Sequence, residues 1–220
     1  MAIAFFDLDR TLIARNSGVA WIRRELALGH IGLGTAMRAM TWIARYHVGL
    51  ADLDGSLRTA IGSLAGTDSA PIIERTNTFY DELARHWTRP GAHTALARHR
   101  AQGDTLLLLT SSSSYLSARF VADLDLAGAL CNTFEIDATG RLTGRTVGPL
   151  CFGPGKLEHA RAYALQAAVE LENCTFYTDS YSDLAVLEKV GAPVAVNPDP
   201  RLRRHALRRG WAIEDWGEPG

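Results

Sequence analysis

Residues 5–12 read FFDLDRTL, an apolar strand that ends in two carboxylates and a hydroxyl. Side chains alternate between the two faces of a strand, so Asp7 and Asp9 are expected to project to the same side. Two carboxylates this close repel each other, and a divalent cation offsets the repulsion; Mg²⁺ favours one or two carboxylates completed by phosphate oxygens and water. The stretch therefore predicts a nucleophile and a proton carrier around a metal. A helix cap or a polar loop is the alternative for this motif taken alone.

The second half of the chain alternates apolar runs with helical patterns. Fully apolar strands that alternate with helices indicate an α/β fold, a Rossmann-like parallel sheet with helices on both faces. Residues 137–140 are expected to form a hairpin turn leading into 141–147, and the Gly-rich tail after the last helix is expected to fray. The predicted strands are 3–8, 105–110, 130–135, 174–178 and 193–196, and the predicted helices are 92–102, 115–124, 155–170, 183–190 and 201–209.

Residues 16–86 follow a different pattern. Apolar residues recur there at helical spacing and glycines mark turns, so three or four helices without strands are expected. We therefore predict a small helical cap of residues 16–86, inserted after the first strand of a core made of residues 1–15 and 87–220. Some cap side chains are candidates to line a substrate pocket, although packing within the cap is the more common role of such residues. These are Trp21, Trp42, Arg45 and Tyr46.

Hydroxyls and a lysine follow other predicted strands. Thr110 and Ser111 come after the apolar run 105–109, where hydroxyls and backbone N–H groups entering a helix suit an anion; a serine-rich N-cap is the alternative. Lys156 starts a helix after a Gly-Pro-Gly turn. A cation there opposes the helix dipole, which is tolerated more readily if it neutralises a phosphate or carboxylates; a solvated lysine is the alternative.

Two further acids follow the strand predicted at 174–178. Asp179 is placed to complete a metal site, and Asp183 to hold a metal-bound water or the lysine. A simple acid at the start of a helix is the alternative for Asp183. In parallel sheets ligands bind at the carboxyl ends of the strands, and all of these polar groups follow such ends.

The composition argues against several classes of protein. Lys plus Arg is 23 and Asp plus Glu is 24, so no net charge would attract nucleic acid. The first residues run directly into a strand, which does not resemble a signal peptide, and arginines interrupt the apolar stretches of 16–50, so no membrane span is expected. Three cysteines without metal-ligand spacing indicate a reducing compartment, and a cytoplasmic protein is expected. They are Cys131, Cys151 and Cys174.

Four segments together resemble the motifs of the haloacid dehalogenase superfamily of phosphohydrolases. Residues 6–12 resemble the first motif, 110–112 the second, 155–156 the third and 177–183 the fourth. The helical segment after the first motif resembles the cap of the phosphoserine-phosphatase-like branch. Residues 16–18 and the ending 196–211 are more similar to its subfamily IB, which includes phosphatases of lipid phosphates.

The resemblance implies a role for each matching residue. Asp7 would attack phosphorus to form an aspartyl-phosphate, and Asp9 would protonate the leaving oxygen and then activate water. Mg²⁺ would be held by Asp7, the backbone carbonyl of Asp9 and Asp179, with Asp183 in the outer shell. The phosphoryl oxygens would be bound by Thr11, Thr110, Ser111 and Lys156.

The expected function is that of a Mg²⁺-dependent phosphatase acting on a small-molecule or lipid phosphomonoester. Related phosphoserine phosphatases tend to carry a glutamate at the position of Asn16 to bind the substrate ammonium, so the neutral Asn16 makes a phosphorylated amino acid less expected. A phosphoserine phosphatase, a phosphotransferase on the same scaffold and a non-catalytic phosphate-binding regulator remain alternatives. The intact acids of the four motifs argue against the regulator.

Overall fold

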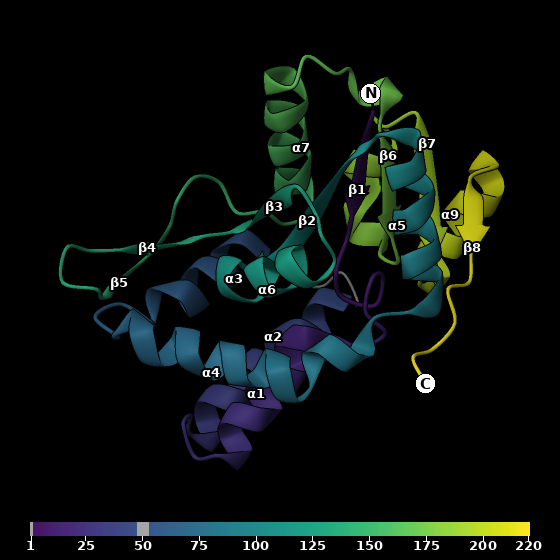
Figure 1. The fold of residues 1–220 in the computed structure, drawn as a ribbon. Helices are drawn as coiled ribbons and strands as arrows, with labels where there is room; N and C mark the ends of the chain where they lie inside the picture. The colour runs from purple at the N-terminus through teal and green to yellow at the C-terminus, as the bar shows by residue number, and fades with distance from the viewer. Residues whose placement is uncertain (1, 48–52) are drawn as a thin grey trace.

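A six-stranded sheet forms the centre of the protein in the computed structural model, which describes the backbone of residues 2–47 and 53–220 and the side chains of 2–41 and 58–220 (Figure 1). The strand order is β3-β2-β1-β6-β7-β8, and each neighbouring pair is parallel. This confirms the predicted parallel α/β architecture. The strands are β1 (Ile3–Phe6), β2 (Thr105–Ser113), β3 (Gly128–Asn132), β6 (Thr175–Thr178), β7 (Ala192–Val196) and β8 (Ala212–Glu214).

Helices cover both faces of this sheet because its strands are apolar on both sides. Phe6 packs into the core cluster under α5 and α6, whereas its neighbour Phe5 packs into the opposite cluster under α7, α8 and α9. Both phenylalanines are fully buried, as the alternation of side chains along a strand requires. The helices are α5 (Pro90–Gln102), α6 (Ser114–Asp123), α7 (Pro154–Gln166), α8 (Leu184–Leu187) and α9 (Pro200–Arg209), with 3-10 turns η1 (Ala84–Trp87), η2 (Leu171–Asn173) and η3 (Tyr181–Asp183).

The segment between β1 and η1 is mainly helical, and its described residues contain isolated bridges but no strand. Its helices lie together beyond the carboxyl edge of the sheet (Figure 1). The division into a core of residues 1–15 and 87–220 and a cap of residues 16–86 stays a prediction. Among the helices of the described residues, none is both long and apolar enough to cross a membrane. The helices of this segment are α1 (Ser17–Ala27), α2 (Leu33–His47), α3 (Leu53–Gly62) and α4 (Ser69–Glu82).

The single strand predicted at 130–135 is wrong. The chain leaves the sheet after β3 and enters a separate antiparallel hairpin, β4 (Phe134–Ile136) and β5 (Leu142–Thr146). The buried Asn132 marks the break, because its side-chain amide donates to the Ser111 carbonyl (2.7 Å) and its oxygen accepts from the Cys151 amide (2.9 Å). The hairpin packs against the helical segment instead, where the Ser69 hydroxyl donates to the Gly140 carbonyl at 2.8 Å.

The expectation that the C-terminal tail frays is also wrong. Strand β8 adds a sixth parallel strand beside β7, and Trp216 just beyond it is only 4% exposed. Gly91 makes room for this indole, since a Cβ there would lie 2.5 Å from the Trp216 Cγ. Arg89 then holds the last residues through an ion pair with Glu218 at 2.7 Å. A three-residue strand is too short to show a period in the sequence, which is why the pattern missed it.

Replacing Trp216 with Ala is expected to destabilise the protein by about 3 kcal/mol, because the deletion removes a buried aromatic side chain and leaves a cavity beside α5. Urea unfolding followed by circular dichroism measures the free energy of unfolding. Leu207→Ala is the matched control, since Leu207 is 67% exposed on α9 and its truncation leaves no cavity. Equal stability of the two variants would contradict the role assigned to the tail.

Candidate active site

The polar groups predicted from the four motifs gather at the carboxyl ends of β1, β2 and β6. Asp7 follows β1, Thr110 lies within β2, Asp179 follows β6, and Lys156 lies in the first turn of α7. The Lys156 ammonium donates to Asp7 Oδ1 at 2.8 Å and to Asp183 Oδ2 at 2.8 Å. Lys156 thereby joins Asp7 and Asp183, which lie 176 positions apart in the sequence.

Lys156 is buried, with 3% of its surface exposed, so the solvated-lysine alternative is wrong. The turn before α7 places it there. Gly153 has φ +49°, and a Cβ on Gly155 would lie 2.0 Å from the Leu150 carbonyl oxygen, so the segment needs glycine. Burial disfavours the charged ammonium, but the adjacent carboxylates of Asp183 and Asp7 outweigh this and hold the pKa of Lys156 well above its usual value.

Asp7 differs from an ordinary aspartate. Its pKa is raised to about 7, mainly by burial and also by the charges of Asp183 and Asp9, while Lys156 opposes the rise. The nearby Asp183 is fixed by two donors, Lys156 and the Thr178 hydroxyl at 2.7 Å. The Asp7 carboxylate therefore has one oxygen bonded to the Lys156 ammonium and retains lone pairs for another partner.

Asp9 lies beside Asp7 but is held by a different element. Its Oδ1 accepts a hydrogen bond from the Ser17 backbone amide at 2.8 Å, at the start of α1. Burial raises the pKa of Asp9, and the Ser17 amide opposes the rise. The residue between Asp9 and Thr11 has positive φ, +60° at Arg10, which turns the chain sharply after the strand. The first helix of the helical segment, α1, thus begins beside Asp9, the residue expected to protonate the leaving oxygen.

Thr11 and Asp179 tie the loops after β1 and β6 together. Thr11 is fully buried, and its hydroxyl oxygen accepts from the Asp179 amide at 2.9 Å. This contact positions the Asp179 backbone; a direct bond from Thr11 to a phosphoryl group stays a prediction. Asp179 is 6% exposed. Burial and the charges of Asp7 and Asp183 raise its pKa well above the usual range.

The acidic cluster suits a divalent cation. Four carboxylates, those of Asp7, Asp9, Asp179 and Asp183, share the single buried ammonium of Lys156 in the described part of the site. Burial is the main cause of the raised carboxyl pKa values, and neighbouring carboxylates add to the rise at Asp7 and Asp179. In the described residues no three acidic, histidine or cysteine side chains form a complete metal cage. A cation held by two carboxylates would therefore take its other ligands from backbone, water and phosphate oxygens, as Mg²⁺ does.

The Thr- and Ser-rich end of β2 includes both buried and exposed hydroxyl groups. Thr110 is 1% exposed, and its oxygen accepts from the Ser112 amide at 3.2 Å. The Ser113 hydroxyl caps α6 by accepting from the Leu116 amide at 3.5 Å, so the N-cap interpretation is confirmed for that serine. Ser111 is exposed and lies at the pocket wall. Its position depends on Asn132, which the sequence analysis missed although a polar residue ends an otherwise apolar strand.

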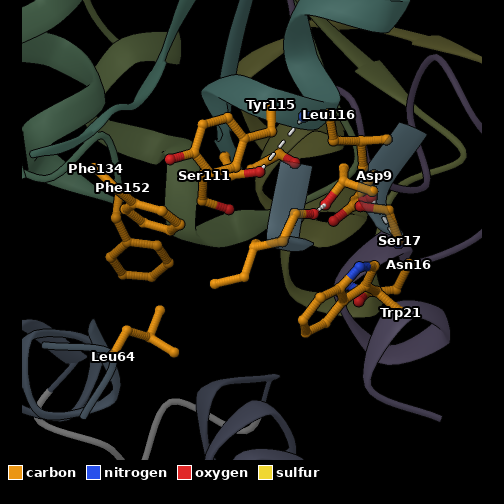
Figure 2. A pocket seen from close by; sticks show the side chains of 15 residues that line it. Asp9, Asn16, Ser17, Trp21, Leu64, Ser111, Tyr115, Leu116, Phe134 and Phe152 are labelled. Carbon is orange, nitrogen blue, oxygen red and sulfur yellow. Dashed lines mark hydrogen bonds between the residues drawn. The ribbon is translucent and has the colours of Figure 1, made fainter. Parts of the chain in front are cut away.

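A pocket of about 300 Å³ opens next to Asp9. Figure 2 shows Asp9 and Ser17 at one end and Phe134, Phe152 and Leu64 at the other. Trp21, one of the predicted cap residues, lines it, whereas the side chains of Trp42, Arg45 and Tyr46 lie outside the described residues. The aromatic residues of β4, α6 and the loop before α7 carried no sequence signal, because nothing local distinguishes them from core residues.

Comparison with known proteins places these features in a family. The family model described as haloacid dehalogenase-like hydrolase matches residues 4–188. Phosphoserine phosphatase SerB1 of Mycobacterium tuberculosis is 33% identical over 222 residues, covering 98% of this chain and 71% of that protein. Histidinol-phosphatase of Neisseria meningitidis is 26% identical over 96% of this chain and 97% of that protein. A crystal structure of a Bordetella pertussis protein with unknown function has a TM-score of 0.87 at 28% identity, covering 98% of this chain and 99% of that one.

Proposed function

This chain belongs to the haloacid dehalogenase-like hydrolases and is a phosphatase, and from that premise we propose that it is a Mg²⁺-dependent phosphomonoester hydrolase that acts through an aspartyl-phosphate on Asp7. The membership confirms the resemblance inferred from the four motifs. The observation that carries the proposal is the placement of Asp7 at the end of β1, with one carboxylate oxygen 2.8 Å from the buried Lys156 ammonium and Asp9 beside the pocket.

In the proposed first half-reaction, a carboxylate oxygen of Asp7 attacks phosphorus and the bond from phosphorus to the leaving oxygen breaks. Asp9 donates its proton to that oxygen, so a neutral alcohol departs. Lys156 and Thr110 hold the phosphoryl oxygens in line with Asp7, and Ser111 provides a further donor at the pocket wall. Positioning and charge neutralisation supply most of the catalysis in phosphoryl transfer.

In the second half-reaction, Asp9 takes a proton from a water molecule, whose oxygen attacks the aspartyl-phosphate. The bond between phosphorus and the Asp7 oxygen breaks, which releases inorganic phosphate and regenerates both carboxyl groups. The raised pKa of Asp9 suits this alternation between acid and base. Bound Mg²⁺, held by Asp7, the Asp9 carbonyl and Asp179, would neutralise charge on the phosphoryl oxygens.

Phosphate release from a panel of phosphomonoesters, measured with Mg²⁺ and with EDTA, tests the proposal. We expect release that needs Mg²⁺ and returns when the metal is restored. Addition of acceptor alcohols distinguishes hydrolysis from phosphotransfer, since a transferase would form a new ester. The name of the mycobacterial relative favours phosphoserine phosphatase as a second candidate, so phosphoserine belongs in the panel. The three free cysteines support a cytoplasmic location.

Asp179→Asn is expected to stabilise the metal-free protein while abolishing its response to Mg²⁺. A carboxyl group whose pKa is raised by burial destabilises the fold when ionised, so at neutral pH the neutral amide should unfold at a higher temperature. For a domain of this size, each kcal/mol corresponds to roughly 2–4 °C. Thermal melts of wild type and variant, in EDTA and in excess Mg²⁺, measure both effects.

The matched control is Asp81→Asn, which removes a half-exposed carboxylate on α4 that pairs with Arg119 and is not part of this cluster. Its melting temperature should not rise in EDTA, and its Mg²⁺ response should equal that of wild type. If Asp179→Asn kept the full Mg²⁺-induced shift, Asp179 would not be a metal ligand.

A further inference from the structure

The pocket beside Asp9 is where the leaving group of the substrate must lie. Asp9 is the group proposed to protonate the leaving oxygen, and its side chain forms one end of the pocket (Figure 2). Ser111, near the end of β2, also lines the pocket. A phosphoryl group at Asp7 would therefore direct its alcohol portion past Asp9 and into the pocket. The chemistry of the lining then determines which alcohol fits.

The lining is apolar and aromatic away from Asp9. Six side chains from α1, α4, α6, β4 and two loops provide this surface: Trp21, Leu64, Ile72, Tyr115, Phe134 and Phe152. Tyr115 and Phe134 meet edge to face, with ring centroids 5.9 Å apart, so the far end of the pocket has a defined shape. Binding of methylene or aromatic groups to such a surface is favourable because it removes apolar area from water.

The described lining offers no counter-charge to a charged leaving group. Asp9 is the one Asp, Glu, Lys, Arg or His among the described lining residues, and the proposed reaction already uses it. An ammonium or carboxylate placed against Phe134 would lose its water without gaining an ion pair. Two donors are unpaired there, Trp21 Nε1 and the Tyr115 hydroxyl, and they match a neutral oxygen acceptor.

We propose that this enzyme selects phosphomonoesters of uncharged, predominantly apolar alcohols, and that Phe134 and its neighbours in the pocket determine this specificity. The inference rests on the proposed function, since it assigns the substrate class of the same site. An alkyl or aryl phosphate in solution and the phosphate of a lipid share this chemistry. The pocket of about 300 Å³ is at the lower end of ligand-binding cavities, so it limits how much of a chain can enter.

A near-isosteric pair of substrates tests the charge argument. Propyl phosphate and phosphoethanolamine differ by a methyl group in place of an ammonium. We expect kcat/KM to be at least about 100-fold higher for propyl phosphate, because the ammonium would be buried without a partner. Along the series from ethyl to hexyl phosphate, kcat/KM should rise by up to about fourfold per methylene until the pocket is full. Equal or faster turnover of phosphoethanolamine, or no dependence on chain length, would overturn the inference.

Two variants with matched controls connect the selectivity to the pocket. Phe134→Ala should lower the ratio of kcat/KM for hexyl over ethyl phosphate at least tenfold, whereas Val147→Ala, at an exposed position after β5, should leave the ratio unchanged. Asn16→Asp keeps the acceptor that caps α1 and adds a carboxylate to the pocket, so the ratio for phosphoethanolamine over propyl phosphate should rise at least tenfold. Asn16→Ser keeps a cap without a charge and should not raise it. If neither Phe134→Ala nor Asn16→Asp changed its ratio, the pocket would not determine substrate specificity.

The same assay separates failure of this inference from failure of the proposed function. Acetyl phosphate, a small phosphoryl donor, needs little of the pocket. If it is hydrolysed while the alkyl series shows no preference, the inference alone fails; if it and every ester are inert with Mg²⁺, both fail. Phosphatidic acid in phosphatidylcholine vesicles is the second arm. Faster turnover of the vesicle substrate than of hexyl phosphate would assign a lipid source, and slower turnover a soluble one, both within the proposed class.

Discussion

Asp7→Asn is expected to lower kcat by at least about 10⁴-fold for every substrate of the enzyme, because an amide cannot replace the carboxylate as nucleophile. The fold should survive the change. Burial raises the pKa of Asp7 to about 7, so the folded protein gains little from its charge, and a neutral amide of the same shape should be tolerated. Lys156 also keeps its second partner, Asp183, at 2.8 Å.

The measurement has two parts. Steady-state phosphate release gives the loss of activity, and acid quench followed by peptide mass spectrometry tests whether the wild-type peptide containing Asp7 carries a phosphoryl group that the variant lacks. Asp125→Asn is the control, because Asp125 is exposed with 97% of its side chain accessible and has φ +47°, which asparagine adopts readily. Mass spectrometry of the intact Asp7→Asn protein checks that the new asparagine has not deamidated to aspartate, which would restore the nucleophile. Turnover within tenfold of wild type would exclude Asp7 as the nucleophile.

Those elements of the fold whose physics is local were predictable from the sequence. The alternation of Phe5 and Phe6 between opposite cores follows from strand geometry. Fully apolar strands that alternate with helices indicated a sheet covered on both faces. The convergence of Asp7 and Asp183 was also predictable, because polar residues that end parallel strands meet at one edge. The sequence also favoured Lys156 as a cation that neutralises a phosphate or carboxylates, with a solvated lysine as the alternative, and the structure shows its contact with both acids.

Elements that depend on tertiary contacts were not predictable. Trp216 is buried because Gly91, over one hundred positions earlier, leaves space for its ring, and no local pattern records that complementarity. The break after β3 depends on Asn132 binding the backbone at Ser111 and Cys151. The pocket is a similar case, since Trp21, Tyr115 and Phe134 come from three separate elements and only the assembled fold places them around one space.

Lys156→Met is expected to damage both stability and activity. Methionine fills the space of the aliphatic stem but leaves Asp7 and Asp183 buried side by side with no cation between them. Breaking a buried ion pair by removing one partner costs about 3–5 kcal/mol, which corresponds to a fall in melting temperature of roughly 2–4 °C for each kcal/mol. Turnover should fall by at least about 10³-fold, because the phosphoryl oxygens lose a fixed positive charge.

The dependence of this loss on pH separates charge from packing. Lys156 lowers the pKa of Asp7, so its removal should raise that pKa further above its ordinary value. An acid whose pKa is raised in the folded state destabilises the fold once pH exceeds its unfolded pKa, and protonation relieves the cost as pH falls below the folded value. The stability deficit of Lys156→Met should therefore be larger at about pH 8 than at about pH 5. A deficit due to poor packing would be the same at both.

The sequence provides a matched control, since its other lysine, Lys189, is exposed. Lys189→Met removes the same charge and adds the same side chain at a position with no buried carboxylate to leave unpaired. Its stability and turnover should stay close to wild type at both pH values. If the two variants were equally stable, the buried lysine would not be offsetting the acidic cluster, and the cluster would not need positive charge from Lys156 or from a divalent metal.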